Sequence, residues 1–400
     1  MKILLANITP VIDIIGGVER IFCDMANELA EKGHEISLLY SDNKEGKPYF
    51  RLSEGIKCYN LRHLKLGGKN YEIKNIKFPL YKKLVREVVR LYDKNNARSM
   101  KENFIGDLLA ANIKRVLEFE RPDIIISFRA LTTKFLIVDG ETNIPIISMF
   151  HDDPLDILST ATVQVKKSLE KSARVQVLLP YGEKIVKNYC PKARTIVIPN
   201  AIKQYDVINK CAEKEKYKII YIARLAKRQK QQHLLIEAYN LLKNQYPNWC
   251  VEFWGPATDV EYQQDLVKMI SQYGLENNIS LCGPTDNVEL VMRSGDIFAF
   301  TSLYEGFGIT LAEAMSIGMP VLGIKDCLAV KQLIKDNETG ILCDNTPQDI
   351  ALKLRLLMDN MKLREKIGQA AHQDMQKYAP DIVWNIWESL ITEVESQRWR

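Results

Sequence analysis

Two glutamates at either end of a glycine-broken turn are the residues best suited to do chemistry. In the stretch SLYEGFGITLAEAMSIGMPVLG, residues 302–323, Glu305 precedes Gly306 and Gly308, and seven residues separate it from Glu313. The glycines leave backbone N–H groups open to a ligand, and a loop carboxylate with no evident local partner is suited to accept hydrogen bonds from hydroxyl groups. The two carboxylates together suggest a sugar or a ribose as ligand. Taken alone, Glu313 also fits an ordinary acid near a helix N-terminus.

A basic pair lies in YIARLAKRQKQ, residues 221–231. Arg224 is expected at the end of a strand, and Lys230 is expected six residues later where a helix begins. The Arg fork and the Lys point charge could hold a diphosphate from two sides. A solvated basic loop, with Lys227 and Arg228 beside the pair, is the alternative and has the greater weight on these residues alone.

Two weaker features lie in the first half of the chain. In GGVER, residues 16–20, Gly16 and Gly17 open a helix after a strand and could point free N–H groups at an anion. Taken alone, two glycines before a helix more often form only a tight turn. The run is not Gly-x-Gly-x-x-Gly, so a dinucleotide is not indicated. In SMFHDDP, residues 148–154, His151 directly follows a strand, although a lone histidine is usually structural.

Short apolar runs must position these residues, and they alternate with helix-period segments along the whole chain. The runs are KILLAN, HEISLLY, DIIISF, PIISMF, RVQVLL and TIVIP in the first half, and YKIIYIA, CVEFWG, NISLCG, DIFAFTS, MPVLGI and GILCD in the second. Runs rich in Ile, Val and Leu are typical of strands covered on both faces. Strand–helix alternation therefore predicts an α/β fold with parallel sheets, where ligands bind beyond the carboxyl ends of the strands.

Twelve strands are too many for one sheet, and the polar stretch KQYDVINKCAEKEKYK, residues 203–218, interrupts the pattern. We therefore expect two doubly wound domains. The first spans 1–202 and is completed by 379–400, where an amphipathic helix follows Pro380, and the second spans 203–378. The cleft between two such domains is the expected site.

Composition excludes several classes of protein. The eight cysteines form no Cys-x-x-Cys pair, so we expect buried thiols in a reducing cytosol rather than a zinc site or a redox pair. The opening MKILLANITP is too short for a signal peptide, and no apolar run approaches the roughly 20 residues needed to span a bilayer. The sequence predicts a soluble, cytoplasmic protein.

The net charge of +5 is unevenly placed. Residues 57–101 hold 13 Lys and Arg against three acids, and they interleave these with Tyr71, Phe78, Tyr81 and Tyr92. The segment could be a solvated helical insertion. It could also be a patch that binds an anionic membrane surface. Nucleic acid is not expected, since no nucleic-acid module accompanies the charge.

These pieces, in this order, resemble the retaining nucleotide-sugar glycosyltransferases of glycosyltransferase family 4. The resemblance runs along essentially the whole chain, and EGFGITLAE followed by AMSIGMPVLG is its most specific part. It implies the GT-B fold, in which two Rossmann-like, doubly wound parallel-sheet domains face a cleft and the last helix crosses back to the first domain. It also implies roles for individual residues.

By this resemblance, Glu305 would contact sugar hydroxyls and Glu313 the ribose. Arg224 and Lys230 would bind the diphosphate, and His151 would lie near the reacting centre. The remaining donor contacts would come from Gly16 and Gly17 of the other domain, from the turn Gly306, Phe307, Gly308 and Ile309 along the sugar and diphosphate, and from Val288 beside the nucleobase. The family often has a Gly-x-Gly turn where this chain reads WGPAT, residues 254–258.

The implied reaction is transfer of a hexosyl or N-acetylhexosaminyl group, with retention, from a nucleotide-diphosphate sugar, with UDP expected. The acceptor would be a glycan or a lipid-linked glycan in the synthesis of a polysaccharide or lipopolysaccharide. No metal and no cofactor are expected, because the chain has no Asp-x-Asp motif. Two alternatives are a nucleotide-sugar 2-epimerase and a catalytically inactive nucleotide-sugar-binding partner subunit. The expected location is the cytoplasm, and a peripheral position at the inner face of the membrane is the further expectation.

Overall fold

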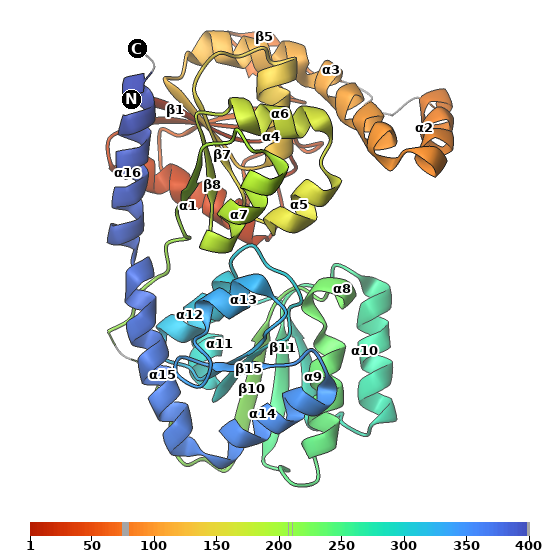
Figure 1. The fold of residues 1–400 in the computed structure, drawn as a ribbon, viewed down its shortest axis with the longest axis vertical. Coiled ribbons are helices and arrows are strands. Elements are labelled where there is room, and N and C mark those ends of the chain that lie inside the picture. The colour runs from red at the N-terminus through yellow and green to blue at the C-terminus, as the bar shows by residue number, and fades with distance from the viewer. Residues whose placement is uncertain (74–79, 207, 210, 398–400) are drawn as a thin grey trace. The chain divides into compact units, whose positions relative to one another are not determined.

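The computed structural model describes residues 1–73, 80–206, 208–209 and 211–397. The chain forms two compact units: the first combines Met1–Ile198 with Trp384–Arg400, and the second is Pro199–Val383. The expected boundaries after residues 202 and 378 lie close to the ends of the second unit. Figure 1 shows helices packed around the sheet of each unit.

The first unit is built on a seven-stranded sheet with the order β3-β2-β1-β6-β7-β8-β9, in which every strand pair is parallel. Its strands are β1 (Lys2–Asn7), β2 (Glu35–Tyr40), β3 (Lys57–Asn60), β6 (Ile124–Ser127), β7 (Ile146–Met149), β8 (Arg174–Val177) and β9 (Thr195–Val197). Its helices are α1 (Gly17–Glu31), α2 (Leu80–Tyr92), α3 (Lys94–Glu120), α4 (Ala130–Lys134), α5 (Pro154–Thr160), α6 (Val163–Lys171) and α7 (Pro180–Tyr189).

All six strands predicted for this half are confirmed. The Ile, Leu and Val residues of β1, β2, β6, β7 and β8 are buried, as a strand covered on both faces requires, whereas β9 at the edge of the sheet is only partly buried. Two features of residues 57–101 were not expected. Residues 57–60 form the edge strand β3, and β4 (Lys65–Leu66) pairs with β5 (Lys69–Asn70) as a hairpin. The interpretation of the whole segment as a helical insertion is therefore wrong.

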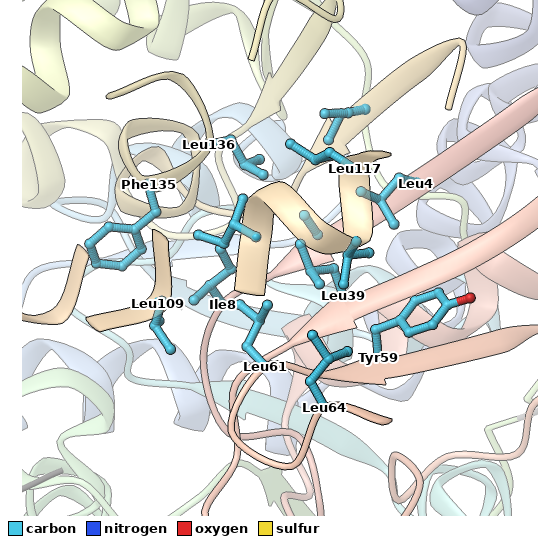
Figure 2. Close-up of a cluster of buried hydrophobic side chains, with 14 of the residues drawn as sticks. Leu4, Ile8, Leu39, Tyr59, Leu61, Leu64, Leu109, Leu117, Phe135 and Leu136 are labelled. Atoms are coloured by element: carbon cyan, nitrogen blue, oxygen red, sulfur yellow. The ribbon is translucent and has the colours of Figure 1, made fainter. Parts of the chain in front are cut away.

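A hydrophobic cluster joins this segment to the sheet (Figure 2). It brings Leu4 and Leu39 from β1 and β2 against Leu109 and Leu117 from α3, with Leu64 from the chain after β3. Each of these side chains is buried, so the first part of the basic segment belongs to the core of the unit.

The last helix completes the first unit. α16 (Pro380–Ser396) begins at the expected proline, and Trp387 in its middle is buried. Two side-chain contacts fix the helix within the unit: His34 Nε2 is hydrogen-bonded to a Glu388 carboxylate oxygen at 3.2 Å, and Arg174 forms an ion pair with Glu393.

The second unit has a six-stranded sheet with the order β12-β11-β10-β13-β14-β15, and all of its pairs are parallel. Its strands are β10 (Tyr217–Ile222), β11 (Trp249–Trp254), β12 (Ile279–Gly283), β13 (Ile297–Phe300), β14 (Val321–Ile324) and β15 (Ile341–Cys343), so all six predicted runs are confirmed. Its helices are α8 (Lys227–Lys230), α9 (Gln232–Leu242), α10 (Val260–Gln272), α11 (Val288–Ser294), α12 (Ile309–Ser316), α13 (Leu328–Leu333), α14 (Pro347–Asp359) and α15 (Met361–Met375).

Each sheet has one point where the direction of strand addition reverses. In the first sheet, β2 and β3 extend one side of β1, and β6 starts the other side. In the second sheet, β11 and β12 extend one side of β10, and β13 starts the other. In open α/β sheets, ligands bind beyond the carboxyl ends of the strands at such a switch point. The loops that follow β1 and β6, and those that follow β10 and β13, are therefore where a site is expected.

Candidate active site

At the switch point of the second sheet, two loops are joined by backbone and side-chain hydrogen bonds. The segment between β10 and α9 includes the short helix α8, and we call this whole segment the loop after β10. It carries Gln229, and the loop after β13 carries Leu303 and Tyr304. The Leu303 N–H donates to the Gln229 carbonyl at 2.8 Å, and Gln229 Nε2 donates to the Tyr304 carbonyl at 3.1 Å. The two predicted groups of site residues in this half of the chain are thus brought to one place.

Lys230 and Glu305 form an ion pair between these loops. Their side chains are only 13% and 11% exposed, and Lys230 Nζ lies 5.5 Å from the centroid of the Phe300 ring. The sequence showed no evident partner for the Glu305 carboxylate, but the structure gives it Lys230. Lys230 is distant in sequence and becomes a spatial neighbour of Glu305 only because β10 and β13 are adjacent.

Hydrogen bonds to the backbone hold Lys230 in position. Tyr221 Oη and Thr301 Oγ1 both donate to the Lys230 carbonyl, at 2.8 and 2.9 Å. Burial raises the pKa of Tyr221 well above its usual value, so its hydroxyl stays protonated. Gln231, with a φ of 50°, then separates α8 from α9. Lys230 therefore ends α8, rather than standing where a helix begins as predicted.

Arg224 lies two residues after β10, and its side chain is exposed. One guanidinium nitrogen donates to Gln229 Oε1 at 2.7 Å, and the Arg224 carbonyl accepts from Gln232 Nε2 at 2.9 Å. Gln229 thus links Arg224 to the loop that carries Glu305. Two cationic side chains and one carboxylate meet at this loop pair, and the guanidinium is open to solvent.

The glycine turn leads into a helix that begins at Ile309, as predicted. Gly308 caps α12 in the left-handed region with a φ of 90°, which favours glycine. The Phe307 side chain is 2% exposed and meets the Tyr378 ring edge-on at a centroid distance of 5.4 Å. The ring therefore anchors the turn and is not available to a ligand. Glu313, in α12, is 7% exposed.

Gly255 in the WGPAT stretch is required by packing. Its φ is 141°, and a Cβ on it would lie 2.2 Å from the Ala223 carbonyl oxygen. Its N–H donates to the Gly283 carbonyl at 2.7 Å. This glycine lets the end of β11 pass close to the loop after β10. Val288, expected beside the nucleobase, is the partly buried first residue of α11.

In the first unit, Gly16 caps α1 and Gly17 is its first residue. A Cβ on Gly16 would lie 2.2 Å from a carboxylate oxygen of Glu19, so that carboxylate lies against the cap of its own helix. A negative charge at a helix N-terminus is favourable. Glu19 is therefore part of the glycine loop, although the sequence alone did not single it out.

Arg129 is a second residue that the sequence reasoning missed. It follows β6, and its guanidinium lies 3.2 Å from Asn7 Oδ1, 3.4 Å from Glu19 Oε1 and 3.2 Å from Asp152 Oδ2. A polar side chain directly beyond a predicted strand end is the signal that could have found Asn7, Arg129 and Asp152 together, because parallel strands end at the same edge of a sheet.

His151 lies beside this cluster and is stacked on Phe128, with the ring centroids 5.0 Å apart. Its Nε2 is buried and has no hydrogen-bond partner among the described residues. Burial, and then the nearby Arg129 charge, lower the pKa of His151 to about 3. The imidazole is therefore neutral near pH 7 and is a very weak base.

The predicted site residues thus fall into two sets. Arg224, Lys230 and Glu305 meet in the second unit, close to the turn that leads to Glu313. Gly16, Gly17 and His151 belong to the first unit. In the part of the chain that the structure describes, no three His, Cys, Asp or Glu side chains gather as a metal-binding group. Metal independence stays a prediction.

Two family models match the chain. Residues 15–204 match glycosyltransferase family 4, and residues 206–374 match the glycosyl transferases group 1. The chain is a glycosyltransferase. A Haemophilus influenzae protein described as an uncharacterized glycosyltransferase is 24% identical over 94% of this chain and 96% of its own length. A Bacillus subtilis poly(glycerol-phosphate) alpha-glucosyltransferase is 28% identical over an aligned region that covers 43% of this chain and 25% of that protein.

Solved structures establish the fold. Sucrose-phosphate synthase from Thermosynechococcus elongatus superimposes with a TM-score of 0.76 at 14% identity and covers 99% of both chains. Anabaena HepE, solved in complex with UDP and glucose, gives a TM-score of 0.69 at 16% identity and covers 98% of this chain and 99% of its own. The predicted GT-B fold is confirmed.

Proposed function

We propose that this enzyme is a retaining, metal-independent glycosyltransferase that moves a hexosyl or N-acetylhexosaminyl group from a UDP-sugar to a glycan or lipid-linked glycan. The observation that carries the proposal is the Lys230–Glu305 ion pair beside Arg224, at the switch point of the second sheet. Cations suit a diphosphate, and a carboxylate suits hydroxyl groups. One ion pair thus places the two kinds of group that a nucleotide sugar needs.

The cations would act on the leaving group. Breaking the anomeric C–O bond places negative charge on the departing diphosphate, and fixed cations stabilise this charge as it develops. Arg224 is exposed and Lys230 is fixed by two hydrogen bonds to its carbonyl, so one is open to a ligand and the other is rigidly placed. In this proposal they replace a metal ion, since the chain has no Asp-x-Asp motif.

Retention of configuration would follow from attack on the same face of the sugar. Glu305 is engaged by Lys230 in an ion pair, and in this proposal it reads the sugar rather than forming the covalent intermediate of retaining glycosidases. The leaving phosphate oxygen would take the proton of the acceptor. His151, neutral at pH 7 and with an unpartnered Nε2, would orient groups rather than act as a base.

The acceptor and the location complete the proposal. The name of the Bacillus subtilis relative indicates transfer of a glucosyl group, in alpha linkage, to a poly(glycerol phosphate). We extend this to polysaccharide or lipopolysaccharide synthesis in the cytoplasm, at the inner face of a membrane that presents a lipid-linked acceptor. No observation favours a 2-epimerase or an inactive partner subunit.

Nucleotide release from a panel of UDP-sugars, with and without lipid-linked glycans, tests the proposal. One donor should give UDP faster when an acceptor is present, and NMR of the product should show the anomeric configuration of the donor. The Glu313→Gln variant should bind bare UDP about tenfold more weakly, because a hydrogen bond to a charged group is lost. Epimerised donor without any acceptor would instead establish an epimerase, and donor binding without turnover would establish an inactive subunit.

A further inference from the structure

The helix α2 carries an apolar face that nothing in the described chain covers. None of its residues is buried. Seven of its large apolar side chains are between 50% and 88% exposed. They are Leu80, Tyr81, Leu84, Val85, Val88, Leu91 and Tyr92. A helix in water normally turns such a face inward, so this face is suited to a partner.

The basic side chains of α2 lie on its other half. With about 3.6 residues per turn, the seven apolar residues occupy one side and the four basic residues the opposite side. The side towards α3 is basic: Lys82 and Arg86 are partly buried, and Lys82 Nζ lies 5.5 Å from the Phe104 ring centroid. Lys83 and Arg90 stay exposed. Figure 1 shows α2 beyond the end of α3, away from the sheet of its unit.

The structure divides the basic segment that the sequence treated as one patch. Tyr71 is partly buried against the core, with the Arg115 guanidinium 4.4 Å from its ring centroid and its carbonyl bonded to Asn112. Tyr71 therefore cannot belong to a membrane patch. Phe78 lies outside the described residues. Tyr81 and Tyr92 are exposed on α2, where a surface contact can use them.

We infer that α2 docks on an anionic lipid bilayer and lies in its interface, with the apolar face immersed and Lys83 and Arg90 at the headgroups. Amphipathic helices with basic residues on the polar half bind in the plane of a membrane interface in this way. At 13 residues it is about 20 Å long, which is too short for a hydrocarbon core of roughly 30 Å. No described helix is long and apolar enough to cross a membrane.

Charge favours a membrane over a second copy of the chain as the occupant. α2 carries four basic residues and one acid, Glu87. A second α2 helix, packed apolar face to apolar face, would carry the same net positive charge and would gain nothing from it, whereas anionic headgroups would attract that charge. The inference rests on the proposed place at a membrane. It does not depend on the proposed donor, acceptor or mechanism.

The test is co-sedimentation of the full chain with vesicles of pure phosphatidylcholine and of phosphatidylcholine with 30% phosphatidylglycerol, a composition chosen as roughly that of an anionic leaflet. An apolar variant carries Leu84→Ser, Val88→Ser and Leu91→Ser, and a charge variant carries Lys83→Ser and Arg90→Ser. All five side chains are exposed, so both variants should fold. UDP binding by calorimetry in the same samples reports on the donor site separately.

The apolar variant should lose at least about a hundredfold in the partition coefficient on both vesicles, because each immersed apolar side chain contributes to binding. The charge variant should lose only the preference for anionic vesicles, and that preference in the wild type should fade with salt. Sedimentation of the apolar variant equal to the wild type would overturn the inference. So would a wild-type dimer in solution that the apolar substitutions dissociate, which would identify the occupant as a second copy. If both variants bind UDP as the wild type does, failure of the membrane inference would not affect the proposed donor site.

Discussion

Separating Lys230 from Glu305 tests how the proposed site works. The two side chains are 13% and 11% exposed, so this ion pair is intermediate between a surface pair and a fully buried pair. A surface ion pair contributes about 0–1 kcal/mol to stability, whereas removing one partner of a buried pair costs about 3–5 kcal/mol. Lys230→Met or Glu305→Gln should each lower the free energy of unfolding by about 2–4 kcal/mol. The double variant should show coupling of at least about 1 kcal/mol in urea denaturation.

The same variants should differ in their affinity for bare UDP. Lys230→Met loses a charged contact to the diphosphate, worth about 1.5–3 kcal/mol, so the Kd should rise about 10–100-fold. Glu305→Gln should bind UDP as tightly as the wild type or up to about tenfold more tightly, because its carboxylate no longer competes for Lys230. Turnover of the UDP-sugar should nevertheless fall, since Glu305 is proposed to read the sugar.

Lys227→Met is the matched control, because Lys227 lies in the same loop and pairs with Asp265 at 3.1 Å where both side chains are exposed. It should cost less than about 1 kcal/mol of stability. Isothermal titration calorimetry measures the UDP affinities. If Glu305→Gln weakened UDP binding as much as Lys230→Met, the division of roles between sugar and diphosphate would be wrong.

Two further predictions concern stability. Gly255→Ala should destabilise the second unit by about 2–4 kcal/mol in urea denaturation, because its Cβ would meet the Ala223 carbonyl oxygen at 2.2 Å with a φ of 141°. Gly274→Ala, at a positive φ in open space, should cost only about 1 kcal/mol, and equal costs would contradict the packing argument. The pKa of His151 is about 3 in the folded state and 6.5 in the unfolded chain. As the pH falls below 6.5, the unfolded chain therefore binds a proton that the folded protein does not, and the free energy of unfolding decreases until the pH approaches 3. Relative to His151→Asn, the wild type should lose up to about 1.4 kcal/mol for each pH unit between 6.5 and 5, and parallel stability profiles would refute the neutral, buried imidazole.

The sequence predicted the strands well, because a buried parallel strand is a local property. Each run of Ile, Val and Leu in KILLAN or YKIIYIA had one plausible structure. The exceptions were β3, which reads KCYN and has little apolar content, and the two-residue strands β4 and β5. The start of α12 at Ile309 was equally local, since Gly308 needs the left-handed region at the cap.

The contacts between distant loops could not be predicted in this way. Lys230 and Glu305 are 75 residues apart, and their pairing depends on β10 lying next to β13. Arg129 meets Asn7 for the same reason in the first sheet. The resemblance assigned Phe307 to the turn along the sugar and diphosphate, and nothing in the motif indicated that its ring packs edge-on against Tyr378. These roles depend on strand order, which composition and periodicity do not encode.

The first unit contains both ends of the chain, and this affects the order in which the protein can fold during synthesis. When residue 198 has left the ribosome, the seven strands of the first sheet are available, but α16 is not. The second unit, Pro199–Val383, is contiguous and can fold as soon as it emerges. The surface that Trp387, Ile391 and Val394 cover in the folded unit stays open until α16 has been made. A nascent chain arrested before residue 384 would hold a finished second unit and an unfinished first one, so the part of the protein that is synthesised first is the last to be closed.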